Sequence, residues 1–431
     1  MYKTNCFLLL TGILLTLILA GVSEAFSGAG SGTEAAPYII TNVIQLQEMK
    51  NELDKWYELG NDIDASETST WNSGAGFEPI GNPSAIYFLG HFDGKGHKIT
   101  NLKINRTTNY IGLFGISNPP STIKNVGLED ANITGNWTVG GLVGQNGNVI
   151  DNSYVKSTIA ITGNKIVGGL VGINTSIITN SYAEINVTNS GIYTGGLVGY
   201  NTQNITNCYS KGNVQGVNRV GGLVGYNTGY VGVSYSTGSV SGSSDEIGGL
   251  IGFNGVTTQI NNAYATGAVS GAKNVGGLVG RNESIVIDSY STGSVTGATN
   301  VGGLAGLSTP TCYDSFWDTQ TSEQPTSACG TGKTTTEMQD VNTFLNAGWD
   351  FNTPVWKICN GTNYPKLEWQ ESLTGDFACP DGVDIYDLAI FIDQWLLQGG
   401  YIADIAPAPG GDGIVNMLDF AVFAENWLAG Q

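Results

Sequence analysis

The chain has 431 residues, 63 of them Gly, and only 12% of its side chains are charged. Lys and Arg number 17 against 36 Asp and Glu, so the net charge is −19 and the chain lacks the cation surplus of a nucleic-acid-binding protein. Hydrophobic residues make up 41% of the chain, too many for a disordered protein, and the Gly period of collagen is absent. The composition indicates an acidic, Gly-rich, turn-rich protein of the all-β class.

The first 25 residues are typical of a secretory signal peptide. Lys3 precedes an apolar run over residues 7–20, and small residues suit cleavage after Ala25. The run is shorter than the roughly 20 residues that a membrane-spanning helix needs. We therefore predict that the signal peptide covers 1–25 and that the mature chain is secreted, extracellular or on the cell surface, without a membrane span.

Export permits disulfides, but the cysteines that remain after cleavage are odd in number and match no zinc motif. One pair, Cys312 and Cys329, has the spacing to close a loop. Because the set is no disulfide framework, packed thiols are the default expectation and the pairing stays open. The cysteines of the mature chain are Cys208, Cys312, Cys329, Cys359 and Cys379.

An amphipathic stretch after Asn42, a candidate N-cap, predicts a helix over 42–55. We assign it to an N-terminal region, 26–100, that caps the fold and contains its first turns. The apolar residues at helical spacing are Leu46, Met49, Leu53 and Trp56.

A repeat of 26 to 28 residues organises the middle of the chain, with Gly-Gly-Leu-apolar-Gly at its start. An Asn follows most copies, and a Tyr recurs later in the unit. The repeats begin at Gly140, Gly168, Gly195, Gly221, Gly248, Gly276 and Gly302. The Asn residues are Asn146, Asn174, Asn201, Asn227, Asn254 and Asn282, and the Tyr residues are Tyr154, Tyr182, Tyr209, Tyr235, Tyr264 and Tyr290.

Each unit contains three short β-prone pieces, which predicts a parallel β-helix of about eight rungs over 101–310. A β-propeller blade needs about 40 to 45 residues, so the unit is too short for that fold. Equivalent residues of successive rungs should then lie directly above one another. We expect the Leu residues to line the core, the Asn amides to bond along the axis and the Tyr rings to stack.

The repeats resemble the GLUG motif, named for its Gly-Leu-apolar-Gly core and found in bacterial secreted and surface proteins. The resemblance covers about 111–307, and the flanks 88–99 and 315–365 resemble segments that accompany such arrays. It implies a right-handed parallel β-helix and a role in adhesion or carbohydrate contact, with no fixed activity. We expect the segment 311–370 to cap the far end through Trp317, Phe344, Trp349 and Trp356.

The last 61 residues, 371–431, contain ten Asp and Glu and no Lys or Arg, whereas 101–310 is nearly neutral. Two similar halves are visible in this tail, each a carboxylate-bearing loop that leads into one amphipathic helix. The first half begins at Asp376 and the second at Asp412. Ca²⁺ takes six to eight oxygen ligands from a short loop of this kind.

The duplication resembles a type I-like dockerin, a small α-helical, EF-hand-like calcium module that binds a cohesin domain. The resemblance implies Ca²⁺ ligands at Asp376, Asp381, Asp384, Asp387, Asp404, Asp412, Asn416 and Asp419. It implies a cohesin-like partner that contacts Ile385, Tyr386, Met417 and Leu418. Some ligand places hold residues without side-chain oxygen, so an acidic helical hairpin without metal remains the alternative.

No catalytic constellation stands out, and the sequence favours a non-catalytic protein. The only His residues are His91 and His97, and the coil's carboxylates are scattered. Asp151 and Asp288 are expected at one place in their repeats, five rungs apart. We predict a secreted scaffold or adhesin attached to a complex or cell surface through a calcium-dependent dockerin–cohesin-type contact. The alternative is a polysaccharide-binding or polysaccharide-degrading β-helix, possessing the same module as a tag.

Overall fold

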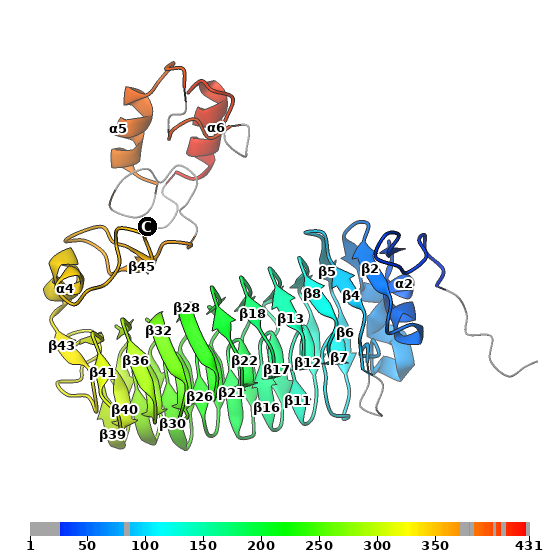
Figure 1. Ribbon diagram of the computed structural model, residues 1–431, viewed down its shortest axis with the longest axis horizontal. Helices are drawn as coiled ribbons and strands as arrows, with labels where there is room; N and C mark the ends of the chain where they lie inside the picture. The colour runs from blue at the N-terminus through cyan, green and yellow to red at the C-terminus, as the bar shows by residue number, and fades with distance from the viewer. Residues whose placement is uncertain are drawn as a thin grey trace, which may run out of the picture.

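The computed structural model describes residues 26–81, 87–370, 379, 383–399, 402–406 and 411–427. The predicted signal peptide lies outside these residues. Short strands stack into an elongated coil, and two helices follow it near the C-terminus (Figure 1). Within the described ranges, no helix combines the length and the apolarity required to cross a membrane.

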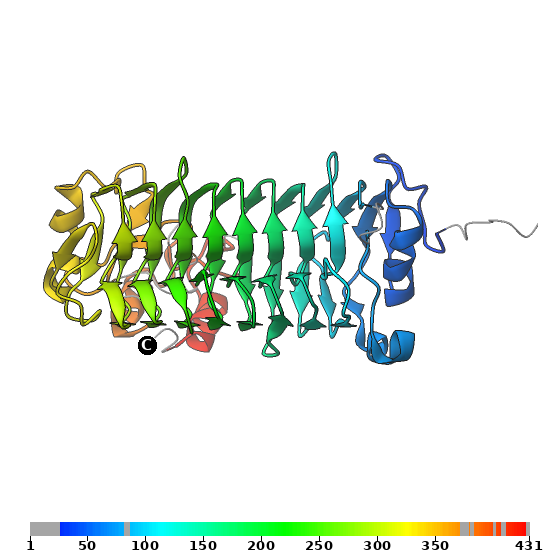
Figure 2. The ribbon, with the colours of Figure 1, turned by 90° about the horizontal axis from the view of Figure 1, so that it is seen from below.

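The coil is a parallel β-solenoid of eight turns, because one of its sheets takes one strand from each turn (Figure 2). Neighbouring strands of this sheet are parallel and in register, for example Val171 beside Val198. The strands are β7 (Phe114–Ser117), β12 (Val143–Asn146), β17 (Val171–Asn174), β22 (Val198–Asn201), β27 (Val224–Asn227), β31 (Ile251–Asn254), β35 (Val279–Asn282) and β40 (Ala305–Ser308).

Two further sheets form other walls of the same turns. One contains β6 (Lys103–Asn105), β10 (Asn132–Thr134), β15 (Ile161–Gly163), β20 (Val187–Asn189), β25 (Val214–Gly216), β29 (Val240–Gly242), β33 (Val269–Ser270) and β38 (Val295–Thr296). The other contains β11 (Thr138–Val139), β16 (Ile166–Gly168), β21 (Tyr193–Gly195), β26 (Val220–Gly221), β30 (Asp245–Gly248), β34 (Lys273–Gly276) and β39 (Thr299–Gly302).

The fourth sheet is the longest, because it begins before the repeats and ends after them. Its N-terminal strands are β1 (Tyr38–Ile40), β2 (Trp56–Leu59), β3 (Ile63–Asp64), β4 (His91–Asp93) and β5 (Lys98–Thr100). The repeats add β8 (Thr122–Lys124), β9 (Gly127–Glu129), β13 (Val149–Asp151), β14 (Tyr154–Lys156), β18 (Ile178–Thr179), β19 (Tyr182–Glu184), β23 (Ile205–Thr206), β24 (Tyr209–Ser210), β28 (Tyr230–Ser236), β32 (Gln259–Ala265), β36 (Ile285–Ile287) and β37 (Tyr290–Ser291). It ends with β41 (Cys312–Tyr313), β42 (Phe316–Asp318) and β43 (Thr331–Lys333).

The prediction of three strands per turn was too low. In most turns the fourth sheet alone receives two strands, because a residue between them adopts a left-handed conformation and bends the chain. Asn152, Asn180 and Asn207 occupy this place, with φ of 44°, 50° and 53°. Asn tolerates this region better than most residues, which is why it recurs there.

The predicted ladders of identical residues are confirmed. The repeat Leu residues are buried in one continuous core. The Asn side chains are fully buried and joined end to end, from Asn146 Nδ2 to Asn174 Oδ1 at 2.8 Å and onward to Asn282. The Tyr rings from Tyr154 to Tyr290 stack with centroids 4.6–5.0 Å apart.

The N-terminal helix is shorter than predicted. Asn42 is its N-cap and accepts a hydrogen bond from Gln45 N at 3.0 Å. Glu52 leaves the helical region at φ −136°, so Trp56 instead begins β2 and stacks on His91 at 3.7 Å between ring centroids. The helical elements here are α2 (Val43–Glu48), η1 (Met49–Asn51) and η2 (Ser66–Gly74).

The segment after the repeats does more than close the far end. β42 and β43 extend the stack, but the residues that follow fold back along the coil's side and cover the Tyr rings of its last turns. Trp356 Nε1 donates to Asn262 Oδ1 at 2.9 Å, and Trp369 Nε1 donates to Val233 O at 3.0 Å. The elements are α3 (Thr335–Met338), α4 (Val341–Leu345), β44 (Trp356–Lys357) and β45 (Lys366–Leu367) (Figure 1).

The expectation of packed thiols was wrong for four of the five cysteines. Cys312 pairs with Cys329 and Cys359 with Cys379, each with Cα atoms 5.4 Å apart. Cys208 remains a buried thiol in the coil core. The second disulfide joins the flanking segment to the chain that leads to the last helices, a tertiary contact that no spacing rule reveals.

The two helices near the C-terminus are α5 (Ile385–Asp393) and α6 (Met417–Glu425). They share a small core in which the rings of Phe391 and Phe423 lie 5.2 Å apart. Val383 and Val415, at equivalent places before the two helices, are both fully buried in it. The duplication seen in the sequence is therefore a pair of loop–helix units packed on each other.

Candidate functional site

Three carboxylates converge in the chain between α5 and the first turn of α6. One oxygen from each of Asp404, Asp412 and Asp419 lies within 4.8 Å of the others. Asp404 and Asp419 are buried, whereas Asp412 is exposed at the mouth of the cluster. The structure therefore brings together three of the eight predicted calcium ligands.

Backbone N–H groups hold these carboxylates in place. Asp419 accepts hydrogen bonds from the amides of Ile405 at 2.6 Å and Ala406 at 2.7 Å. Asp404 accepts from the amides of Asp412 at 2.9 Å and Gly413 at 2.8 Å. The loop's own amides thus fix the orientation of the Asp404 and Asp419 carboxylates.

A glycine allows this close approach. Gly411 has φ +76°, and a Cβ at that position would collide with the carboxylate of Asp404. The loop therefore needs a residue without a side chain immediately before Asp412. A sharp turn at Gly is also what short calcium loops require.

The first unit repeats the start of this arrangement. Asp384 is the N-cap of α5, and its amide donates to Asp387 Oδ2 at 2.8 Å, as the amide of Asn416 donates to Asp419 Oδ2 at 2.8 Å in α6. Asn416 Nδ2 reaches Asp412 at 3.2 Å. The other predicted ligands of the first unit, Asp376 and Asp381, lie outside the described residues.

The donor set suits a hard divalent cation. Carboxylate oxygens are the ligands that Ca²⁺ prefers, and 371–431 contains no Lys or Arg to neutralise the cluster. Asp404, Asp412 and Asp419 would hold the ion. Bound Ca²⁺ would supply positive charge that relieves the repulsion among them.

The four residues predicted to contact a partner are all exposed. They occupy the first turns of the two helices, Ile385 and Tyr386 in α5 and Met417 and Leu418 in α6, with exposed fractions between 56% and 64%. Large, exposed apolar side chains thus occupy matching places in the two units. This is a typical composition for a protein-docking surface.

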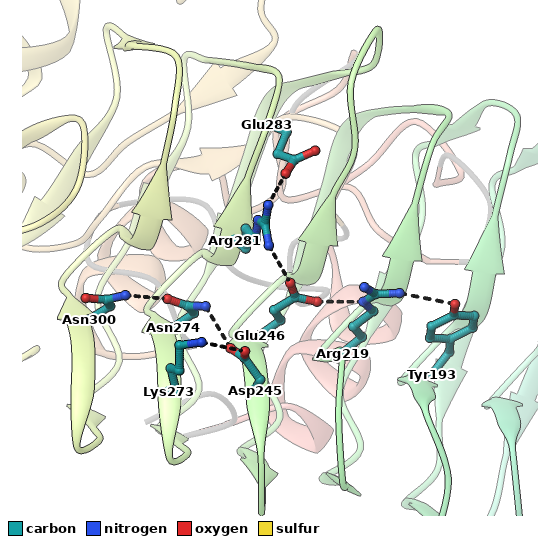
Figure 3. A network of polar contacts seen from close by, with 9 residues as sticks. All are labelled: Tyr193, Arg219, Asp245, Glu246, Lys273, Asn274, Arg281, Glu283 and Asn300. Carbon is teal, nitrogen blue, oxygen red and sulfur yellow. Dashed lines mark hydrogen bonds and ion pairs between the residues drawn. The ribbon is translucent and has the colours of Figure 1, made fainter.

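Carboxylates also gather on one wall of the coil, but there they are ion-paired (Figure 3). Glu246 is buried and shared by Arg219 Nε and by Arg281 Nη1 at 3.4 Å. Asp245 contacts Lys273 Nζ at 3.2 Å. Arg219 also lies over the rings of Tyr226 and Phe253, at 4.9 and 5.0 Å from their centroids. Cations therefore hold these acids in a network of ion pairs.

The register corrects one predicted alignment. Asp151 was predicted to align with Asp288, but it aligns with Thr179 in the next turn and, through the following turns, with Ile287. Asp288 lies one residue further on, in the column of left-handed Asn residues. Asp288 and Asp314 are neighbours in that column. Burial, and then the charge of Asp314, raise the pKa of Asp288 to about 6.

A groove of about 770 Å³ lies on the outer side of the longest sheet, and Asn426, directly after α6, also lines it. Asn180 and Asn207 line it beside Tyr182 and Tyr209, and Trp369 lines it where the flanking segment leaves the coil. The sequence indicated the Tyr column, whereas the column of left-handed Asn residues and the place of Trp369 were not predicted. The recurring order of Asn or Asp, a small residue and Tyr was the available signal.

Comparison with known proteins identifies the repeats. The GLUG motif family matches four segments of the coil, 135–160, 163–188, 190–215 and 271–296. These cover part of the predicted 111–307 array, while the stacking itself continues through the turns between them.

Two curated relatives are longer proteins that this chain matches in part. Halomucin of Haloquadratum walsbyi is 39% identical over 136 residues, which are 30% of this chain and 2% of that protein. A protein of Evansella cellulosilytica, provisionally named a Gly-rich membrane protein, is 37% identical over 429 residues, 82% of this chain and 46% of that one. The chain thus spans less than half the length of either relative.

A solved structure shares the fold. It comes from Bacteroides ovatus and is provisionally named an immunoglobulin A1 protease; it is 22% identical, and the match covers 79% of this chain and 95% of that one with a TM-score of 0.51. Since identity is low, the likeness concerns architecture alone. The coil of this chain is a parallel β-solenoid built with GLUG repeats.

Proposed function

We propose that this protein is a secreted or surface-attached, non-catalytic scaffold whose coil is held to a partner by a calcium-dependent, dockerin-like module. The convergence of Asp404, Asp412 and Asp419 carries the proposal. The names of the two relatives, a halomucin and a Gly-rich membrane protein, favour a surface location. The right-handed winding of the coil, and the division of the chain after residues 25, 100, 310 and 370, are part of the same proposal.

The second support is the position of the exposed apolar residues. The cluster lies at the start of α6, so an ion there would stiffen the turn that presents Met417 and Leu418. The first unit presents Ile385 and Tyr386 in the same way, with Asp384 and Asp387 beneath them. Binding of Ca²⁺ and recognition of a cohesin-like partner would thus be coupled through two helix N-termini.

Calorimetric titration of the full chain with CaCl₂, with MgCl₂ as comparison, tests the metal step. Asp412→Asn should abolish the heat of Ca²⁺ binding while preserving the hydrogen bond from Ile414 N, because an amide oxygen accepts it as well. Asp393→Asn is the matched control, an exposed acid of α5 outside the cluster. Absence of Ca²⁺ binding in the unmodified chain would overturn the metal proposal.

Pull-down by a panel of immobilised recombinant cohesin domains tests the partner step. Capture should need Ca²⁺ and should fail for the double variant Met417→Ser, Leu418→Ser. A matched control changes Ile392, which is 63% exposed but lies on the last turn of α5. Equal capture of both variants, or no capture by any cohesin, would contradict the docking proposal.

A further inference from the structure

The groove on the longest sheet is built from columns of identical side chains. Along each turn, alternate residues face outward, so an Asn, a Tyr and a third polar residue lie side by side. In one turn these are Asn180, Tyr182 and Glu184, and in the next Asn207, Tyr209 and Lys211. A linear polymer lying along the coil axis would meet the same groups once in every turn, about 4.8 Å apart.

Among the described residues, the flanking segment buries one end of the Tyr column and leaves the other end partly exposed. Tyr235, Tyr264 and Tyr290 are buried beneath the flanking segment, with at most 5% of their surface exposed. Tyr154 and Tyr182 lie beyond that segment and are partly exposed. The row of Tyr rings and Asn amides thus continues past the flanking segment, to Asn152 and Tyr154.

Trp369 lines the groove beside Tyr209 and Tyr235. Its Nε1 atom is anchored to Val233 O at 3.0 Å, and its ring is tilted by 33–37° against the rings of Tyr209 and Tyr235. The indole is thereby fixed in the wall of the groove, where a ligand lying along the Tyr column would meet it. Rigid aromatic side chains give contact area at little cost in conformational entropy.

We infer that this groove binds a linear, uncharged polysaccharide along the coil axis. Amide and hydroxyl groups pair with sugar hydroxyls, and the aromatic side chains offer apolar surface to the sugar ring's C–H groups. An acidic polymer fits less well, because Lys211 is already paired with Glu184 at 3.0 Å. A peptide finds no strand edge to join, since the strands of these turns are paired on both sides.

Affinity electrophoresis of the full chain in gels that contain hydroxyethyl cellulose, xyloglucan or galactomannan tests the inference. We expect retardation by at least one of them, and a loss of about tenfold or more in affinity for Tyr182→Ala and for Asn180→Gly, which preserves the left-handed bend. Matched controls on other walls are Tyr200→Ala and Asn164→Gly, and both should bind as the unmodified chain does.

All runs include EDTA, so that failure of calcium docking cannot imitate failure of the groove. Circular dichroism and resistance to trypsin verify that each variant is folded. Absence of retardation in every neutral gel would overturn the inference. Equal losses in groove and control variants would do the same. So would retardation only in a comparison gel that contains polygalacturonate, an acidic polysaccharide.

Discussion

The coil and the C-terminal pair of units are both products of repetition, but their copies meet differently. In the coil each residue stacks on its own equivalent, as Asn174 does on Asn201 at 2.8 Å. In the C-terminal region the two copies face each other across one shared core, where Phe391 contacts Phe423. In the coil, a contact between equivalent residues is repeated from turn to turn. In the C-terminal region, the contact between the two copies is made only once.

This difference explains where the charges lie. A carboxylate repeated in every turn would meet its own kind about 5 Å away, a destabilising arrangement. The coil instead alternates signs in one outward column, with Glu129, Lys156, Glu184 and Lys211 in successive turns. The C-terminal region gathers its acids in a loop lined by backbone amides, an arrangement that a cation completes.

The largest expected effect comes from breaking the buried amide ladder. Asn201→Ala leaves Asn174 Nδ2 and Asn227 Oδ1 without their side-chain partner, which should cost about 4 kcal/mol of unfolding free energy. Guanidinium denaturation followed by circular dichroism measures this loss. Asn164→Ala, in an exposed amide pair, is the control and should change the midpoint little. Equal effects would mean that burial is not what gives the ladder its strength.

A tight turn of the coil should be nearly as sensitive. A Cβ at Gly222 would collide with the carbonyl oxygen of Gly249 and with Ser236, so Gly222→Ala should cost about 3 kcal/mol. At Gly255 the nearest atom, Thr228 Cγ2, is 3.2 Å from a Cβ, and Gly255→Ala should be mild. Thermal unfolding of both variants compares the two sites. A mild effect at Gly222 would show that the walls can separate.

Calcium should act on one region only. At a free concentration of 100 times its Kd, Ca²⁺ should stabilise the C-terminal pair of units by about 2.7 kcal/mol and leave the coil unchanged. Hydrogen exchange with and without EDTA resolves the two regions. Added protection at α6 but not at β22 is the expected result, and protection of neither would count against metal binding there.

The smallest effect concerns Asp288, whose pKa is raised to about 6 by burial and then by Asp314. The folded chain holds this proton more tightly than the unfolded chain, so stability falls as pH rises from about 4 to about 6. Asp288→Asn should therefore raise the free energy of unfolding at pH 7 but not at pH 4. The gain at pH 7 should be about 1 kcal/mol or less, because the carboxyl group is half exposed.

Asp350→Asn is a control of opposite sign. Hydrogen bonds from Thr353 and from the amide of Asn352 hold the pKa of Asp350 below its ordinary value, so its contribution is present at neutral pH and lost in acid. Asp350→Asn should lower the midpoint at pH 7. If both variants changed the midpoint at pH 7 in the same direction, the net charge of the chain would explain the effect, and not the surroundings of each carboxylate.

Much of the coil followed from the spacing of a few residues. Recurring Leu, Asn and Tyr at intervals of 26 to 28 predicted the parallel stack, its ladders and its eight turns. The helix at Asn42 was predicted too long, because apolar spacing continues past Glu52 while the backbone does not. In the C-terminal region, composition indicated the carboxylates but not that Asp404 would join Asp412 and Asp419, since the loop's own amides decide that.

The sequence alone determined the repeat period, the parallel stacking and the division between a neutral coil and an acidic tail. These follow from local rules, because each turn contacts only its neighbours. Tertiary structure decided the disulfide partners, the return of Trp356 and Trp369 along the coil, and hence the groove. The two Trp contacts join residues 94 and 136 positions apart, Trp356 with Asn262 and Trp369 with Val233, and no periodic pattern encodes them.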